Sequence, residues 1–316
     1  MRQGVLLAGL AVICVAAAPL PRRDADRLIG DVRILSADDM QGRMVGTEGS
    51  AKARAYILER IRKIGLKPGY QGRFEQPFSF QRKGAPVQGT NIVAQIAGTQ
   101  KGGPVLVISA HYDHLGVQRG QVYNGADDNA SGVAGVLAVA EAFKARRPKH
   151  TVIFVFFDGE EEGLQGAKAF VDAPPVPLER IALNVNLDMI GTNGKNELYA
   201  AGAYSFPWMK GRLEALAADA PVKLLLGHDD PKLGADDWSN QSDHWAFGLA
   251  GRPWIYFGVE DHPEYHQPSD DFATIPQPFF KAAAATVVAA ALKFEADLDA
   301  IAQRKGKVSL NLSPSP

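Results

Sequence analysis

The sequence is short of cysteine and of net charge. Its single cysteine, Cys14, lies near the N-terminus, and its 34 lysine and arginine residues nearly balance its 35 aspartate and glutamate residues. A chain this close to neutral has no broad basic surface, which argues against nucleic-acid binding. One cysteine forms no disulfide within the chain, so we expect stability to come from core packing or from bound metal.

The N-terminus carries an apolar stretch, GVLLAGLAVICVAAA, which follows Arg2 and ends in small residues. This pattern is typical of a secretory signal and is short for a membrane span. We predict a signal peptide over residues 1–18, export to the periplasm or the exterior, and no stable membrane insertion after cleavage. An uncleaved anchor is the alternative. Lipid anchoring through Cys14 is disfavoured because the bulky Ile13 precedes it.

Beyond the leader, largely apolar runs alternate with helical patterns. The runs at 104–110 and 151–157, and those that begin at Ile181 and Arg252, predict buried strands, and the spacing over 49–66, 131–147 and 278–304 predicts helices. This alternation predicts an α/β fold with a mostly parallel central sheet and helices on both faces, a three-layer sandwich. We expect one domain over 19–305, a disordered tail over 306–316, and an excursion over the site at 204–245.

Polar side chains stand where the predicted strands end. His111 follows one strand, the glutamates at 160–162 follow the next, and Asp188 and His266 follow two more; the segment NGADDNASG precedes a helix. Ligands in open α/β sheets bind beyond the carboxyl ends of the strands. We therefore expect these side chains to converge.

Each of these features has an ordinary explanation when it is taken alone. A lone histidine is usually a surface or core residue, adjacent aspartates in a loop usually form turns, and a run of glutamates is usually a solvated face. Several carboxylates gathered in a partly buried pocket would repel one another unless a cation lay between them. Their convergence therefore predicts a metal site with histidine and carboxylate ligands, as zinc prefers.

The same segments resemble the co-catalytic dizinc aminopeptidases of bacteria, relatives of glutamate carboxypeptidase and the glutaminyl cyclases. The resemblance runs from QGRMVGTEGSAKARAYILERIRKIGLKP through AHYDHLG, NGADDNASGVAG, DGEEEGLQGA and NLDMIG to SDHWAFGLAGRPWIYF and EYHQPSDDFATI. It covers about residues 35–298. In GADDNASG the family's bridging residue is the aspartate before NASG, which is Asp128 rather than Asp127.

The resemblance implies two zinc ions per chain, with three protein ligands each. His111, Asp128 and Asp188 would bind one ion, and Asp128, Glu161 and His266 the other, so that Asp128 bridges them. A water molecule shared by the two ions would be the nucleophile. Zinc is favoured over manganese or cobalt by the resemblance and by the ligand types.

The resemblance also implies three catalytic roles. In the family's Glu-Glu-any-Gly-Leu pattern, Glu160 would be the general base and Glu162 a variable, exposed position. Asp113 would hold His111 in its ligating tautomer. Tyr265 would bind the oxyanion, or it is a packing aromatic.

Other polar and aromatic residues near these motifs receive structural interpretations. His114 is expected to be only a neighbour of His111, and Asp243 and His244 to shape the pocket or local structure. Asp270 and Asp271 would orient His266 or cap a turn. No role is predicted for His228 or His262, and the tryptophans would line a pocket or belong to the core: Trp208, Trp238 and Trp245.

The predicted function is an exported dizinc aminopeptidase that acts on peptides. The alternatives are a carboxypeptidase or a glutaminyl cyclase of the same fold. Cyclases of the family use one zinc, and the full ligand set argues against that reading. A non-catalytic binding domain would have lost ligands or the base, and a serine hydrolase would need a Gly-x-Ser-x-Gly elbow, which is absent. The sequence does not indicate an oligomeric state.

Overall fold

The structure is a computed structural model that describes residues 18–304. The predicted signal peptide, apart from its last residue, and the predicted tail at 306–316 lie outside the described residues. No helix in the described range is long and apolar enough to cross a membrane.

Within residues 18–304, nine strands form one sheet in the order β1-β3-β7-β4-β8-β11-β9-β10, with β2 paired to β3. The strands are β1 (Lys67–Pro68), β2 (Glu75–Arg82), β3 (Ala85–Ile96), β4 (Val105–His111), β7 (Thr151–Phe157), β8 (Ile181–Leu187), β9 (Glu197–Ala201), β10 (Lys223–Leu226) and β11 (Trp254–Gly258). A separate hairpin consists of β5 (Gly116–Gln118) and β6 (Gln121–Tyr123).

The parallel part of the sheet lies at its centre. Strands β7, β4, β8 and β11 are adjacent and parallel. The outer strands β3 and β9 join this group antiparallel, and β10 pairs parallel with β9. The predicted α/β class is confirmed, with the parallel pairing concentrated in the strands that the sequence marked as apolar runs. Their four carboxyl ends lie at one edge of the sheet.

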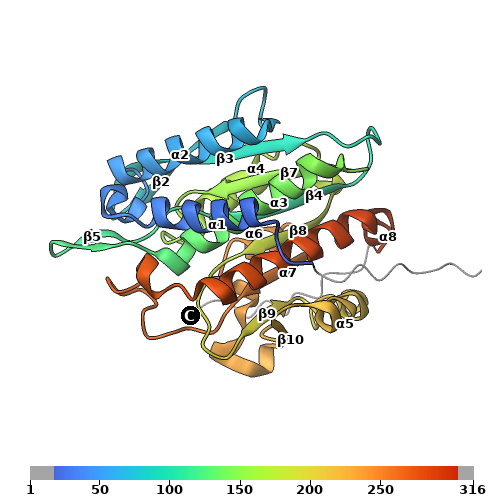
Figure 1. Cartoon of the computed structure of the whole chain (residues 1–316). Coiled ribbons are helices and arrows are strands. Elements are labelled where there is room, and N and C mark those ends of the chain that lie inside the picture. Colours follow the sequence, from blue (N-terminus) through green and yellow to red (C-terminus); the bar gives the residue numbers. More distant parts are fainter. Residues whose placement is uncertain (1–17, 305–316) are drawn as a thin grey trace, which may run out of the picture.

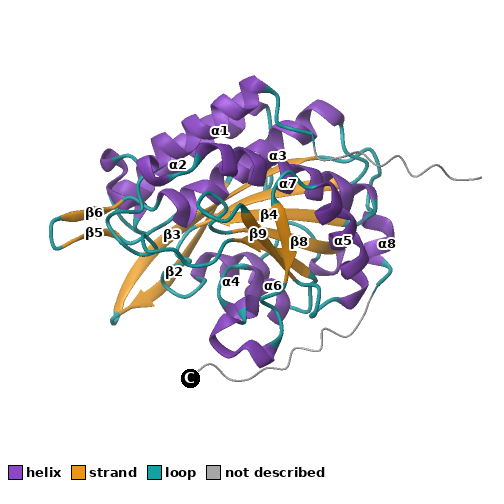
Figure 2. Ribbon diagram, turned by 60° about the horizontal axis from the view of Figure 1, so that its bottom comes forward, coloured by secondary structure: helices purple, strands orange, loops and turns teal. Residues whose placement is uncertain are grey.

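Helices cover both faces of the sheet (Figures 1 and 2). One layer holds α1 (Arg22–Leu35), α2 (Glu48–Ile64), α3 (Gly132–Arg146) and α7 (Gln277–Ala296), and the opposite layer holds α4 (Gln165–Asp172) and α6 (His244–Leu249). The helices α5 (Lys210–Asp219) and α8 (Leu298–Ala302) pack against α7. Because both faces are covered, every residue of β4 and β8 is buried, which explains their apolar runs.

Two helix boundaries show how local sequence sets the elements. The hydroxyl of Thr47 accepts a hydrogen bond from the Ser50 amide at the start of α2, and Gly65 ends that helix in the left-handed region at φ 81°. The single helix expected over 278–304 is instead two helices, α7 and α8, separated at Asp297. The expected excursion at 204–245 contains α5 and β10, so part of it extends the sheet.

Candidate metal centre

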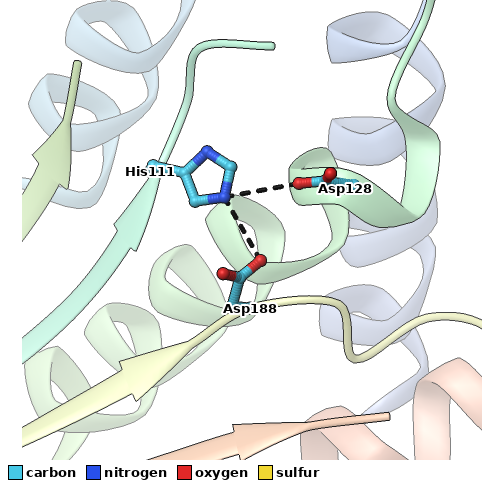
Figure 3. Close-up of side chains that lie close together, drawn as sticks. All are labelled: His111, Asp128 and Asp188. Carbon is cyan, nitrogen blue, oxygen red and sulfur yellow. Dashed lines mark hydrogen bonds and ion pairs between the residues drawn. The ribbon is translucent and has the colours of Figure 1, made fainter. Parts of the chain in front are cut away.

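Three donor atoms meet where two central strands end. His111 is the last residue of β4, Asp188 follows β8, and Asp128 lies in the turn before α3. Nε2 of His111 lies 3.2 Å from Oδ1 of Asp188 and 3.3 Å from Oδ1 of Asp128 (Figure 3). All three residues are buried. We call these residues the strand group.

A second set of donors shares Asp128. Nε2 of His266 lies 3.1 Å from Oδ2 of Asp128 and 3.4 Å from Oε2 of Glu161. We call Asp128, Glu161 and His266 the loop group, because Glu161 and His266 lie outside the strands and helices. The two oxygens of Asp128 face one group each, which is the arrangement of a bridging ligand.

The spacing within both groups fits a metal ion. Two ligand atoms that each lie 2.0–2.1 Å from a tetrahedral zinc are about 3.3 Å apart. The four distances above, from 3.1 to 3.4 Å, have this value. Within residues 18–304, two sets of donor atoms that lie within 4.8 Å of one another could hold a metal: one is the strand group, and the other consists of His114, Asp128 and Glu161. His114, which the sequence left as a neighbour, therefore lies at the centre.

The turn that carries Asp128 is held from two sides. The carboxylate of Asp270 accepts hydrogen bonds from the backbone amides of Asp127 (2.9 Å) and Asp128 (3.0 Å). Asp270 thus orients the bridging residue Asp128. The sequence instead predicted that Asp270 would orient His266 or cap a turn. Arg43 is fully buried and donates to the carbonyl oxygens of Tyr112, Leu35, Asn124 and Gly125.

Arg43 received no role from the sequence. Among the described residues its guanidinium donates to carbonyl oxygens only, yet the carboxylates of Asp128 and Asp270 attract it. Burial lowers its pKa to about 10, so the side chain is charged at neutral pH. A buried cation of this kind costs desolvation energy, which its hydrogen bonds and the neighbouring negative charge offset.

The loop that carries His266 is tied to the same turn. Nε2 of His262 lies 3.0 Å from Oδ2 of Asp127, and Nδ1 lies 3.1 Å from Oε2 of Glu264. Oδ1 of Asp127 accepts from the Gly191 amide at 2.6 Å. His262 therefore links the loop group to the bridging turn, a role that its spacing four residues before His266 does not reveal by itself.

Glu160 and Glu161 have separate positions in the structure. Neither oxygen of Glu160 belongs to a donor group, and the residue lines the pocket beside His111. Burial raises the pKa of Glu160 well above its usual value; His111 opposes this shift and Asp243 adds to it. Glu162 is part-buried rather than exposed and pairs with Arg82 at 2.9 Å.

Asp113 contacts the glutamates more closely than it contacts His111. Its carboxylate accepts hydrogen bonds from the backbone amides of Glu160 (3.0 Å) and Glu161 (3.3 Å). Nδ1 of His111 lies 3.7 Å from Oδ1 of Asp113 but 3.2 Å from the Asp113 carbonyl oxygen. The carbonyl is thus the nearer partner of the His111 ring, and the carboxylate fixes the turn of the glutamates.

The centre has an excess of negative charge. Burial would lower the pKa of His111, but Asp188 and Glu160 raise it well above its usual value. Burial would also lower the pKa of His266, but the hydrogen bonds that its ring donates to Asp128 and Glu161 raise it to about 10. The carboxylates that stabilise these charged imidazoles would also stabilise a divalent cation, which would take the place of the imidazole protons.

A pocket of about 330 Å³ opens beside both groups. Its apolar wall includes Leu164, Met189, Trp238 and Val259, and Asn240 and Gln241 contribute amides. Among the residues that the structure describes, no lysine or arginine lines it, whereas the carboxylates that do are Asp128, Glu160, Glu161, Asp188 and Asp261.

The aromatic candidates divide between pocket and core. Tyr265 lines the pocket, and its ring stacks on His266 with centroids 3.9 Å apart. Trp238 also lines it and stacks on His228 at 3.7 Å, so this part of the segment 204–245 faces the site as expected. Trp208 packs against the core.

The pair Asp243 and His244 lies close to the centre but outside both donor groups. His244 is buried, and its Nε2 lies 3.0 Å from the Trp238 carbonyl oxygen. Asp243 is buried too, and neither of its oxygens has a hydrogen-bond partner in the described part of the chain. Burial raises the pKa of Asp243 well above its usual value, which favours a neutral side chain.

Known proteins resemble this chain in sequence. The profile of peptidase family M28 matches residues 91–291. A probable zinc metalloprotease of Pyricularia oryzae is 27% identical over 94% of this chain and 66% of its own length. The chain spans two thirds or less of the length of the first curated relatives that it matches.

Solved structures share the fold. A zinc aminopeptidase from Bacillus subtilis superposes with a TM-score of 0.67 at 19% identity, over 86% of this chain and 95% of that one. A Porphyromonas gingivalis glutaminyl cyclase gives the same TM-score and identity, over 86% and 98%.

Proposed function

Because the chain belongs to peptidase family M28, a family of zinc metalloproteases, we propose that it is an aminopeptidase with two zinc ions. It would hydrolyse the first peptide bond of peptides with a free N-terminus. The observation that carries this proposal is the acidic pocket beside two donor groups that share Asp128. We also propose, from the N-terminal sequence, that the protein is exported.

The donor atoms of this chain fit two zinc ions. His111, Asp128 and Asp188 would hold one, and Asp128, Glu161 and His266 the other, since their nitrogen and oxygen atoms have the spacing of zinc ligands. Bound zinc ions of this kind lower the pKa of water and polarise a carbonyl group.

Glu160 is suited to move the proton. When water attacks the carbonyl carbon and the C–N bond breaks, one proton must pass from the water to the departing amine. Glu160 lies in the pocket without a place in either donor group, and the Asp113 carboxylate fixes its backbone. A carboxylate in such a position serves first as general base and then as general acid. Tyr265, which also faces the pocket, would donate to the developing oxyanion.

The charge of the pocket favours an amine over a carboxylate. A carboxypeptidase must bind the free carboxylate of its substrate, usually with arginine or lysine. The described residues place neither in the lining, whereas the exposed carboxylate of Asp261 lies at the pocket in addition to the metal ligands and Glu160. Two bound zinc ions would offset the three ligand carboxylates, so Glu160 and Asp261 are the lining groups that would attract a substrate ammonium group and repel a substrate carboxylate.

One substrate comparison tests the proposal. The same chromogenic aminoacyl amide is offered with a free and with an acetylated N-terminus, and zinc is measured in the purified protein. We expect cleavage of the free amine at least about a hundredfold faster and about two zinc ions per chain. Preference for the acetylated substrate would exclude an aminopeptidase. Cyclisation of an N-terminal glutamine with release of ammonia, without cleavage, would indicate a cyclase.

A further inference from the structure

His114 makes a short contact with Glu161, a residue of the loop group. It lies three residues after His111, its side chain is fully buried, and its Nδ1 is 2.8 Å from Oε1 of Glu161. The same nitrogen is 3.6 Å from Oδ2 of Asp128. Two roles are consistent with this position: His114 is a further metal ligand, or it is a hydrogen-bond donor that orients Glu161.

The distances separate these roles. Donor atoms of the two groups that share a metal position are 3.1–3.4 Å apart, as zinc ligands are. The contact of His114 with Glu161, at 2.8 Å, is shorter and has the length of a charge-assisted N–H···O hydrogen bond. It joins Oε1 of Glu161, whereas the other oxygen, Oε2, faces His266.

We propose that His114 is a positioning residue that donates from Nδ1 to Oε1 of Glu161 and so turns Oε2 toward the metal position of the loop group. The inference rests on the proposed function, since it requires that this group binds metal. It assigns the chain a second histidine at the loop group that acts through Glu161 without touching the ion.

The surroundings of Nε2 support the tautomer of His114 in which Nδ1 carries the hydrogen. Nε2 of His114 is buried and has no hydrogen-bond partner among the described residues. If Nδ1 bound a metal, the hydrogen would reside on Nε2 and remain unpaired. With the hydrogen on Nδ1, Nε2 is left with an unpaired acceptor, and orphaned buried donors are the rarer of the two in proteins.

Packing fixes the ring in this orientation. A Cβ atom at Gly125 would lie 2.5 Å from Cδ2 and 2.6 Å from Cγ of His114, so the ring rests directly on the glycine backbone. Gly125 also has a φ of 55°, which suits glycine. The His266 ring also lies close to that of His114, with the ring centroids 5.8 Å apart. The imidazole therefore has little freedom to turn away from Glu161.

The test compares two substitutions. In His114→Asn the side-chain amide nitrogen takes a position close to that of Nδ1 and keeps a donor for Glu161, whereas His114→Leu removes it at similar volume. The affinity for each zinc ion is measured by competition with a chromophoric chelator. We expect His114→Leu to weaken binding of the loop-group ion by about 10- to 100-fold, as loss of such outer hydrogen bonds does. We expect His114→Asn to stay within about threefold of the wild type.

Each result that would contradict a positioning role for His114 can be told apart from the others. If His114→Asn weakened the ion as strongly as His266→Ala does, His114 would be a ligand. If His114→Leu left both affinities unchanged, it would have no role. Thermal melts and the affinity for the other ion show whether the Leu variant is folded; the Asn variant decides the question if it is not. A wild type that bound fewer than two ions would overturn the proposed function and this inference together, whereas two ions with indifferent variants would overturn this inference alone.

Discussion

His111 ends strand β4 and Asp188 follows the neighbouring strand β8, whereas Glu161 and His266 lie on loops. The side chain of His111 is 2% exposed and that of His266 is 37% exposed. The backbone at His266 has a φ of 55°, a conformation that a non-glycine residue adopts only when its surroundings hold it there. Strand pairing fixes the strand group, which is one half of the centre. The other half, the loop group, needs further contacts to hold its ligands in place, and we call the residues that make these contacts anchors.

The anchors of the loop group are side chains that a ligand pattern does not include. His262 ties the loop of His266 to Asp127, the Asp113 carboxylate accepts from the backbone of Glu161, and His114 contacts the Glu161 carboxylate. Loops have lower local stability than central strands, so donors placed on them depend on such contacts. Because they lie on loops, the side chains of the loop group also have access to solvent and to substrate.

The largest effect should come from a change that leaves both halves of the centre intact. Glu160→Gln removes the proton acceptor but preserves size and hydrogen bonding, so we expect kcat to fall by about 10²- to 10⁴-fold. Both zinc ions should remain, because Glu160 belongs to neither donor group. Steady-state kinetics and zinc content are the measurements.

The matched control is Glu162→Gln, two residues further along the same turn. Glu162 pairs with Arg82 away from the centre, and such a part-exposed pair contributes little, so its kcat should stay within about twofold. Near-normal turnover in Glu160→Gln, or loss of an ion from it, would show that the two glutamates are wrongly assigned.

The difference between the strand group and the loop group predicts that the two metal ions are lost one after the other. As chelator concentration rises, the ion of the loop group should leave first, at about 10- to 100-fold lower chelator activity, because its ligand His266 is more exposed and lies on a loop. His266→Ala should abolish this first phase and keep the second, and His111→Ala should remove the tightly held ion. Zinc content after equilibration is the measurement. Loss of both ions in one phase from the wild type would mean that the halves do not differ.

The meeting of His111 and Asp188 was predictable because sheet topology is regular. Apolar runs indicated which strands are central, and parallel central strands place their carboxyl ends at one edge, so His111 and Asp188 were expected to meet. The structure does place them 3.2 Å apart. The choice of Asp128 rather than Asp127 as the bridging residue came from the family resemblance. The structure gives the two aspartates different surroundings.

The anchors were not predictable, since they depend on torsions and on backbone partners. Arg43 bonds only to carbonyl oxygens, which exist at every residue and leave no pattern in a sequence. His114 follows His111 by three residues, and only the turn at Asp113 decides that its ring reaches Glu161. The pocket wall at Trp238 comes from a loop whose path depends on distant packing, including the stack with His228.

The smallest predicted effect concerns the anchor His262. Burial would lower its pKa, but hydrogen bonding to Asp127 outweighs this and raises the pKa to about 9. The folded protein therefore favours protonated His262, and this stabilisation is fully present below about pH 6.5, the ordinary value, and is lost as pH rises through 9. In metal-free protein, His262→Gln should lower the free energy of unfolding by about 1–2 kcal/mol at pH 6, allowing for solvent screening.

At pH 10 the difference between wild type and His262→Gln should shrink to less than about 0.5 kcal/mol, because neutral His262 loses most of its attraction to Asp127. Denaturant unfolding at both pH values provides the measurement. Asp261→Asn, an exposed change in the same loop, serves as the control and should shift stability by less than about 0.5 kcal/mol at either pH. A His262→Gln difference that was equal at pH 6 and pH 10 would mean that the ring anchors the loop by packing and not by charge. The loop group would then depend on its anchors for shape alone.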